Sequence, residues 1–295
     1  MITSLQPGVD PHHQGGEKVS GIVSIYQGPM GRISLFDTNV SVVEHVHPQL
    51  HVMIKISGSD SIYQVGDSAC RLSDDQMVLV NSWTPHANWR GSDDPGTLMI
   101  ALYIEPTWMR SVIGWPVETT PPFAMPVAPV SPSTYAWALD IADLLATSSR
   151  LQEESLCDRV SCLLRGVLAG FDAMQTPRPS PRPVNYRIRR AISILLSDAG
   201  PRGKLKRLPK SVGLSRSSFY ELFKTSTGVP PGLYADGITL DHAVRALVET
   251  EKPIGEISAE LGFSAQSHFT RFFKSKVCFT PSEFRYVASC SGSPH

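Results

Sequence analysis

A degenerate internal repeat in the last third of the chain constrains its fold more than any other feature of the sequence. The segment GLSRSSFYELFKTSTGVPP starts at Gly213, and GFSAQSHFTRFFKSKVCFTP starts at Gly262, 49 residues later. Each copy contains, in order, a glycine, a serine, an aromatic residue, an apolar cluster ending in Phe-Lys, and a proline. The repeat predicts two copies of one supersecondary unit.

The order of residue types in each copy predicts a sharp turn followed by a helix. Gly213 and Gly262 suit the left-handed conformation that ends one helix and turns the chain. Ser215 and Ser264 are typical N-cap residues for the next helix. A short helical segment precedes each turn, LKRLPKSVG in the first copy and IGEISAELG in the second. Each copy is therefore predicted to be a helix-turn-helix unit.

The second helix of each unit is predicted to have a buried aromatic face and an exposed polar face. Arg, Gln and Ser near a helix N-terminus suit base edges and phosphates in the major groove. A plain helical hairpin would explain one such match, but two copies favour DNA binding. The predicted DNA-binding residues are Arg216, Ser217, Tyr220, Glu221 and Lys224 in the first helix and Gln266, Ser267, Thr270, Arg271 and Lys274 in the second.

Charge separates the two halves of the chain. Residues 1–184 carry 11 basic and 18 acidic side chains, whereas residues 185–295 carry 16 basic and 9 acidic ones, a net charge of +7. This asymmetry indicates that only the second half binds a polyanion.

Residues 185–287 resemble the DNA-binding domain of the AraC/XylS family of transcription regulators, most strongly over the stretch that runs from IGEISAELG to TPSEFR. The segment PPGLYADGITLDHAVRALVET resembles the helix that links the two units in that family. The resemblance implies two recognition helices in successive major-groove segments on one face of the duplex, about 34 Å apart. Base contacts would then come from Ser217, Tyr220 and Glu221, and from Gln266, Ser267 and Arg271.

Several positions depart from the family pattern. Pro209 stands where a small alanine is usual, and it fits only in the first turn of its helix. Cys278 replaces a glycine after the second recognition helix. Glu221 places a negative charge where a cation is common, and this charge would repel phosphate. We therefore expect the second unit to anchor DNA binding.

The first half of the chain has the pattern of a β domain followed by helices. Residues 19–105 contain short β-branched or aromatic runs separated by Gly, Asp, Asn and Ser. Strands this short favour a sandwich or small barrel over βαβ units. From residue 134 to residue 171 the apolar spacing becomes helical. The sequence predicts an α+β protein with two domains, of which the second is all-α.

Proline-rich segments mark the predicted boundaries. PPFAMPVAPVSP, residues 121–132, reads as a connector, and TPRPSPRPV, residues 176–184, reads as an extended linker between domains. The predicted organisation is a loose leader at 1–18, an effector-binding domain at 19–175 with its helices at 134–171, the linker at 176–184, and the DNA-binding domain at 185–288.

The segments EHVHPQLHVMIKISG and LVNSWTPHANW resemble the cupin-like effector domain of AraC/XylS regulators. The resemblance implies a small organic effector bound without a metal, so neither a metal nor a cofactor is expected. It also implies that the chain is a regulator and not an enzyme, with activation as the commoner mode and RNA polymerase as a partner. The residues expected to contact the effector are His45, His47, Tyr63, Trp83 and His86.

The histidines leave two alternatives open. His45 and His47 share one strand face, as metal ligation needs, and His86 would be a third ligand. The carboxylate that accompanies such histidines in metal-binding cupins has no counterpart here, but His51 could substitute for it. The chain would then be a cupin-type metalloenzyme with a vestigial DNA-binding domain. Alternatively, these rings pack or form hydrogen bonds at a sheet edge.

Cysteine usage and hydropathy predict a cytoplasmic location without a membrane span. The five cysteines are scattered and form no C-x-x-C pair, which is typical of reduced thiols. No run of eighteen apolar residues is present, and the first residues lack the pattern of a signal peptide. The apolar stripes of residues 134–171 leave a homodimer open.

Overall fold

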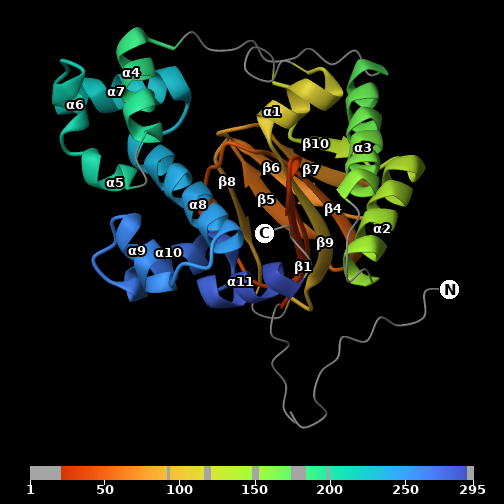
Figure 1. Ribbon diagram of the computed structural model, residues 1–295. Coiled ribbons are helices and arrows are strands. Elements are labelled where there is room, and N and C mark those ends of the chain that lie inside the picture. Colours follow the sequence, from red (N-terminus) through yellow and green to blue (C-terminus); the bar gives the residue numbers. More distant parts are fainter. Residues whose placement is uncertain are drawn as a thin grey trace.

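The computed structural model describes residues 21–91, 94–115, 121–147, 153–173, 184–197 and 200–290. An antiparallel β domain with two long helices precedes a helical domain (Figure 1). The predicted α+β class and two-domain architecture are confirmed. The predicted leader, residues 1–18, and nearly all of the predicted linker, residues 176–184, lie outside the described residues.

The strands form two antiparallel sheets. One has the order β1-β2-β9-β4-β7-β10 and the other the order β3-β8-β5-β6. The strands are β1 (Gly21–Gly28), β2 (Gly31–Thr38), β3 (Val42–His45), β4 (Leu50–Gly58), β5 (Ser61–Val65), β6 (Ser68–Leu72), β7 (Gln76–Val80), β8 (His86–Trp89), β9 (Thr97–Ile104) and β10 (Val127–Pro129).

The larger sheet is buried on both faces. Side chains alternate along a strand, so Met53 and Ala101 turn toward the smaller sheet, whereas Val52 and Leu102 turn toward α2 (Pro132–Thr147) and α3 (Glu153–Ala173). These two helices confirm the helical prediction for residues 134–147 and 153–171. Their apolar stripes pack on the sheet of their own domain. A homodimer through α2 and α3 would therefore have to use the outer faces of these helices.

Three strands were not predicted from the sequence. The polar run of β6 and the short HANW segment of β8 lack the β-branched enrichment that signals a strand. β10 lies inside the segment read as a proline-rich connector, which corrects that reading. Pro129 fits there because β10 is an edge strand, where a missing N–H disrupts no ladder.

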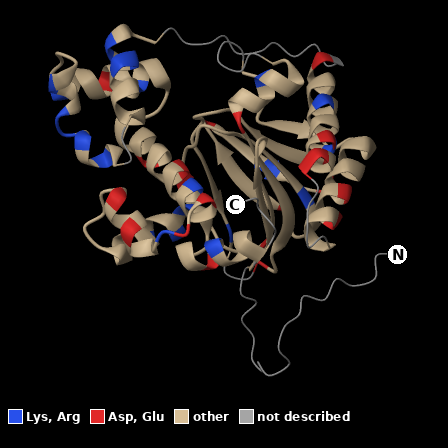
Figure 2. Ribbon diagram, in the orientation of Figure 1, with Lys and Arg blue, Asp and Glu red and all other residues tan. Residues whose placement is uncertain are grey.

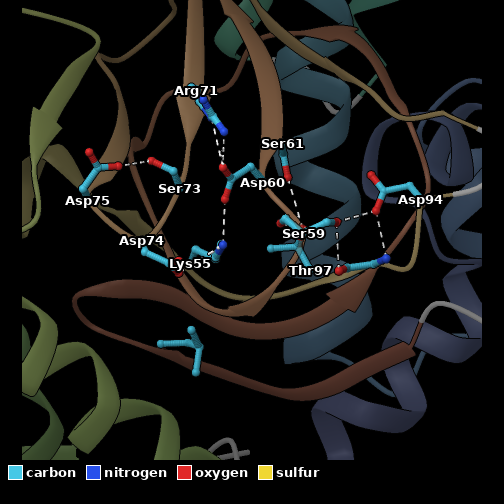
Figure 3. A network of polar contacts seen from close by, with 12 residues as sticks. Lys55, Ser59, Asp60, Ser61, Arg71, Ser73, Asp74, Asp75, Asp94 and Thr97 are labelled. Carbon is cyan, nitrogen blue, oxygen red and sulfur yellow. Dashed lines mark hydrogen bonds and ion pairs between the residues drawn. The ribbon is translucent and has the colours of Figure 1, made fainter.

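A polar network closes one end of the β domain (Figure 3). The buried Lys55 ammonium lies 2.7 Å from Asp60 Oδ1 and 3.0 Å from Asp74 Oδ1, while Arg71 pairs with Asp60 at 2.6 Å. Ser59 Oγ donates a hydrogen bond to Asp94 in the neighbouring loop. Because the buried charge of Lys55 is paired, these contacts fix the turns at this end.

The helical domain contains the two predicted units and their linker helix. After β9 the chain forms α1 (Pro106–Trp108) and η1 (Met109–Ile113), which belong to the β domain. The helical domain consists of α4 (Tyr186–Leu196), α5 (Pro201–Lys204), α6 (Leu208–Ser211), α7 (Arg216–Thr227), α8 (Pro231–Glu249), α9 (Ile254–Glu260), α10 (Gln266–Val277) and α11 (Pro281–Cys290).

Candidate DNA-binding surface and effector site

The first helix-turn-helix unit has the geometry that its sequence predicts. Gly213 has a φ of 68°, in the left-handed region between α6 and α7. Ser215 is the N-cap of α7, and its Oγ accepts a hydrogen bond from the Ser218 amide at 3.2 Å. Pro209 lies in the first turn of α6, where its missing N–H leaves no helical bond unmade.

The second unit follows the same plan with one difference. Gly262 has a φ of 79° between α9 and α10, as predicted. The prediction that Ser264 caps α10 is wrong, because α10 begins one residue later and its N-cap is Ala265. The Ser264 hydroxyl lies 3.0 Å from Nδ1 of His268 instead.

Both recognition helices bury aromatic rings and expose polar side chains. Phe219, Phe223, Phe269 and Phe273 are completely buried. Tyr220 and Thr270 are half-buried, and the other predicted DNA-binding residues are exposed: Arg216, Ser217, Glu221 and Lys224 on α7, and Gln266, Ser267, Arg271 and Lys274 on α10. Each helix therefore presents its predicted residues on one accessible face.

The positive charge of the DNA-binding half belongs to the first unit. Residues 185–230 carry 10 basic and 2 acidic side chains. Figure 2 shows that Lys and Arg gather on α4, α5 and α6, whereas α9 carries the acidic residues Glu256 and Glu260. Phosphate attraction is thus concentrated in the first unit, even though the second follows the family sequence more closely.

The β domain contacts one face of the linker helix α8. Tyr234, Gly237, Asp241 and Arg245 are spaced three and four residues apart, and they therefore share a face. The Tyr234 ring stacks on Trp83 at a centroid distance of 3.9 Å. A Cβ added at Gly237 would lie 2.6 Å from the carbonyl oxygen of Val46, so only glycine allows this close approach.

Polar side chains continue this contact, which we call the α8 seam, toward the C-terminal end of the helix. Gln49 Nε2 donates hydrogen bonds to Asp241 Oδ1 at 2.6 Å and to Glu105 Oε1 at 2.9 Å. Arg245 pairs with Glu105 at 2.6 Å and with Asp241 at 3.1 Å. Two residues of the β domain and two of α8 thus form one connected network.

The β domain also contributes to the core of each helix-turn-helix unit. Val46 packs in the core of the first unit, and Ile25 packs in the core of the second. Beyond α10, Phe279 stacks on Phe36 of β2 at a centroid distance of 5.8 Å. Cys278, which precedes Phe279, has a φ of 70°, a conformation that glycine adopts without strain. The domain contact therefore involves both units as well as the helix between them.

Two small cavities lie where the domains meet. The first, of about 30 Å³, is lined by β-domain residues that include Arg32, His45 and Gln49, and by Asp241 and Lys276 of the helical domain. The second, of about 50 Å³, extends into the β domain past Tyr63 and Met99 and is closed by residues 276–279. Each has room for a few waters, so an organic effector of ordinary size could enter either of them only if the seam opened.

Two buried cations line the first cavity. Arg32 is 8% exposed, and its guanidinium lies 3.8 Å from the centre of the Tyr103 ring. Its Nε has no hydrogen-bond partner in the described part of the chain. Burial lowers the pKa of Lys276, whose ammonium lies 3.9 Å from Asp236 Oδ2 and 3.4 Å from the Glu44 carbonyl oxygen. An anion placed between Arg32 and Lys276 would compensate their buried charge.

Four histidines surround the boundary between the cavities. His45 on β3 is the cross-strand partner of His86 on β8, which sets their rings 4.2 Å apart. His51 on β4 is paired with Tyr103 on β9, and these rings stack at 4.1 Å. The His47 ring lies 4.9 Å from His86 and 5.4 Å from His51. The register of the two sheets thus brings together side chains from β3, β4, β8 and β9 and from the segment between β3 and β4.

These histidines are held neutral. Burial lowers the pKa of His86 to about 4 and holds the pKa values of His45, His47 and His51 well below the ordinary range. Nε2 of His47 and of His86, and both ring nitrogens of His51, have no hydrogen-bond partner among the described residues. A buried polar group without a partner costs about 1–3 kcal/mol, so these atoms favour a ligand.

The structure brings together most residues that were expected to contact an effector. His45, His47 and His86 form one cluster, and Tyr63 lines the second cavity. Trp83 lines neither of these two cavities; it packs on α8 and lines a separate, wider groove between the β domain and the first unit. Sequence reasoning missed Arg32, Lys276 and the seam face of α8. The one available signal was Gly237, a glycine inside a helical pattern, which often marks a close approach.

Comparison with known proteins places this architecture in a family. A family model described as an AraC-like ligand binding domain matches residues 32–169, and one described as a helix-turn-helix domain matches residues 208–286. The probable transcriptional regulator LumQ of Photobacterium leiognathi is 23% identical over 269 residues, which cover 88% of this chain and 97% of LumQ.

Solved structures with a similar fold include ToxT from Vibrio cholerae. The apo form of a ToxT variant superposes with a TM-score of 0.58 at 14% identity, over 87% of this chain and 97% of ToxT. ToxT with bound unsaturated fatty acid gives a TM-score of 0.57 at 11% identity, over 93% and 98% of the two chains. These identities support a shared fold. No helix in the described ranges is long and apolar enough to cross a membrane.

Proposed function

The chain belongs to the AraC family of transcription regulators, with an AraC-like ligand-binding domain and a helix-turn-helix DNA-binding domain, and we propose that an effector controls it through the α8 seam. The observation that carries this proposal is the packing of the β domain on the helix that joins the two units. The angle and spacing of the recognition helices depend on α8. A ligand that opens the seam would change how both helices bind one duplex.

The effector that best fits the site is a small organic anion. Its carboxylate would lie between Arg32 and Lys276, and its apolar part would displace residues 277–279 from the second cavity. The fatty acid bound to ToxT is a ligand of this chemical class. Because both cavities are small, entry of such a ligand and release of the second unit would be one event.

Arg271 is expected to contact a base or a phosphate of the operator. It is exposed on α10 and forms no ion pair within the described residues. Arg271→Ala should weaken binding by about 1–3 kcal/mol if the guanidinium reads a base. Genomic DNA fragments that the full chain binds are first recovered with it. The measurement is the affinity of each variant for such a fragment, determined by titration. Arg165→Ala, a change on α3 of the β domain, serves as the control and should leave the affinity unchanged.

The same titration tests the DNA-binding function as a whole. Unchanged affinity in Arg271→Ala would mean that α10 does not lie in the major groove. Equal losses in Arg271→Ala and Arg165→Ala would point to long-range charge in place of a contact.

Arg32 and Lys276 are expected to determine affinity for the effector. Straight-chain carboxylates of increasing length should raise the unfolding temperature of the full chain, while the corresponding primary alcohols should not. Arg32→Gln or Lys276→Gln should weaken carboxylate binding roughly 10- to 100-fold, the effect of a hydrogen bond to a charged group. Lys210→Gln removes an exposed charge and is the matched control. Equal stabilisation by alcohols and carboxylates would contradict an anion site.

The remaining predictions follow from the family resemblance. We propose that the chain activates transcription through contact with RNA polymerase in the cytoplasm, because activation is the commoner mode in the family. A homodimer through the outer faces of α2 and α3 remains a prediction. The regulator is preferred over the metalloenzyme because the matching family models describe a helix-turn-helix domain and an AraC-like ligand binding domain.

A further inference from the structure

We infer that His45, His47 and His86 form a binding site for a divalent transition metal at the boundary between the two cavities. Their ligand atoms lie within 4.8 Å of one another, and all three residues are more than nine-tenths buried. This inference departs from the metal-free pocket that the family resemblance implies, and it stands independently of the organic effector.

The hydrogen bonds of the three rings leave Nε2 as the atom that can bind a metal. Nδ1 lies 3.0 Å from the Val43 carbonyl oxygen in His45, 3.1 Å from that of Gln49 in His47, and 2.9 Å from that of Thr84 in His86. A carbonyl oxygen only accepts, so Nδ1 must carry the proton of each neutral ring. Nε2 then has a free lone pair. A backbone acceptor on the other ring nitrogen is the usual second shell of a metal-binding histidine.

Strand register and hydrogen bonds also fix the orientation of the rings. The β3–β8 register sets His45 opposite His86, and each ring is tied to a carbonyl two residues away in the chain. In His47 and His86 the Nε2 atom has no hydrogen-bond partner in the described ranges. Ordinary packing histidines would have that nitrogen bonded or exposed to water. A metal bound to Nε2 would satisfy atoms that the protein leaves unpaired.

The donor set defines the class of metal. Three imidazole nitrogens without a thiolate or a carboxylate suit Zn²⁺, Co²⁺, Ni²⁺, Cu²⁺ or Fe²⁺, and they do not suit Mg²⁺ or Ca²⁺, which prefer oxygen. Three protein ligands leave a coordination position open. His45 and His47 line the first cavity, and His45 and His86 line the second, so water or a small anion can reach this position.

Nearby charge makes an anion the favoured additional ligand. Arg32 and Lys276 act on His45 electrostatically, and a divalent cation would add to that positive charge. An anionic ligand on the metal would offset part of this positive charge. His51, whose ring lies 5.6 Å from His86 and has both nitrogens without partners in the described part of the chain, lies beside this site but outside the group of three ligands.

Metal binding can be measured on the full chain without knowledge of the effector. The protein is stripped with a chelator and titrated with Zn²⁺ by calorimetry and with Co²⁺ by visible absorption. His12 and His13 are adjacent in the sequence and could bind metal by themselves, so all variants carry His12→Gln and His13→Gln. In this background His47→Gln and His86→Gln remove predicted ligands, and His242→Gln removes a histidine of α8 outside the cluster.

The background protein is expected to bind one ion per chain, with the intense visible absorption of low-coordinate Co²⁺. His47→Gln and His86→Gln should each weaken Zn²⁺ binding more than about 100-fold, beyond the 10- to 100-fold effect of losing a second-shell partner. His242→Gln should bind as the background does. Operator binding by each variant confirms that it is folded. Absence of stoichiometric binding in the background, or unchanged Zn²⁺ affinity in folded His47→Gln and His86→Gln, would overturn the site.

Discussion

Replacement of Gly237 with valine is expected to separate α8 from the β domain and to uncouple the two domains. The first added carbon would lie 2.6 Å from the Val46 carbonyl oxygen and 2.8 Å from Val46 Cγ2. Overpacking of this kind costs about 1–3 kcal/mol where side chains can yield, and here a backbone atom blocks the way. Scanning calorimetry should show one unfolding transition for the native chain and two for Gly237→Val.

Gly232→Val is the matched control for this experiment. Gly232 lies in the same helix, but a Cβ added there meets nothing within 4 Å. Both changes replace a glycine of α8 with the same residue, although Gly232 lies in the first turn and Gly237 in the interior of the helix. In Gly237→Val, adding a carboxylate should leave the affinity for operator DNA unchanged. In Gly232→Val, a carboxylate should change this affinity as it does in the native chain. Identical calorimetric profiles for the two variants would refute the role of the α8 seam.

The second large effect is expected for the aromatic core of the second unit. Phe273 is completely buried, and its ring lies 5.8 Å from that of Phe269 and 5.4 Å from that of Phe284. Phe273→Ala should lower the free energy of unfolding by about 3–5 kcal/mol, a large part of the stability of a typical domain. Chemical denaturation measures this loss directly.

Loss of Phe273 should also abolish specific DNA binding while residual, salt-sensitive binding persists. The first unit keeps its own core and most of the positive charge, so phosphate attraction should survive. Phe272→Ala, at the half-buried neighbouring position, should cost less stability. An equal loss of stability in Phe272→Ala and Phe273→Ala would mean that the apolar face of α10 is misassigned.

Local chemistry explains what the sequence could predict. The left-handed Gly213 and Gly262, the cap at Ser215 and the first-turn Pro209 are properties of a few neighbouring residues. They could therefore be predicted without knowledge of the fold. The same reasoning failed at Ser264, because α10 starts one residue later than the corresponding helix of the first unit.

Contacts between distant residues could not be predicted in this way. The histidine cluster depends on sheet register, which pairs His45 with His86 across 41 residues of sequence. The α8 seam joins Gln49 to Asp241, residues that no local pattern relates. Strands β6, β8 and β10 form because neighbouring strands offer hydrogen-bond partners, although their own sequences carry weak β signals.

A footprint on selected DNA tests most directly whether the two recognition helices bind one duplex together. Duplexes enriched from a random library by the full chain are cleaved in solution with and without protein. Two protected segments on one face, about 10–10.5 base pairs apart, are expected, with protection of one segment reduced by Arg271→Ala. Protection of a single segment, or recovery of duplexes without a shared sequence, would contradict a double helix-turn-helix regulator.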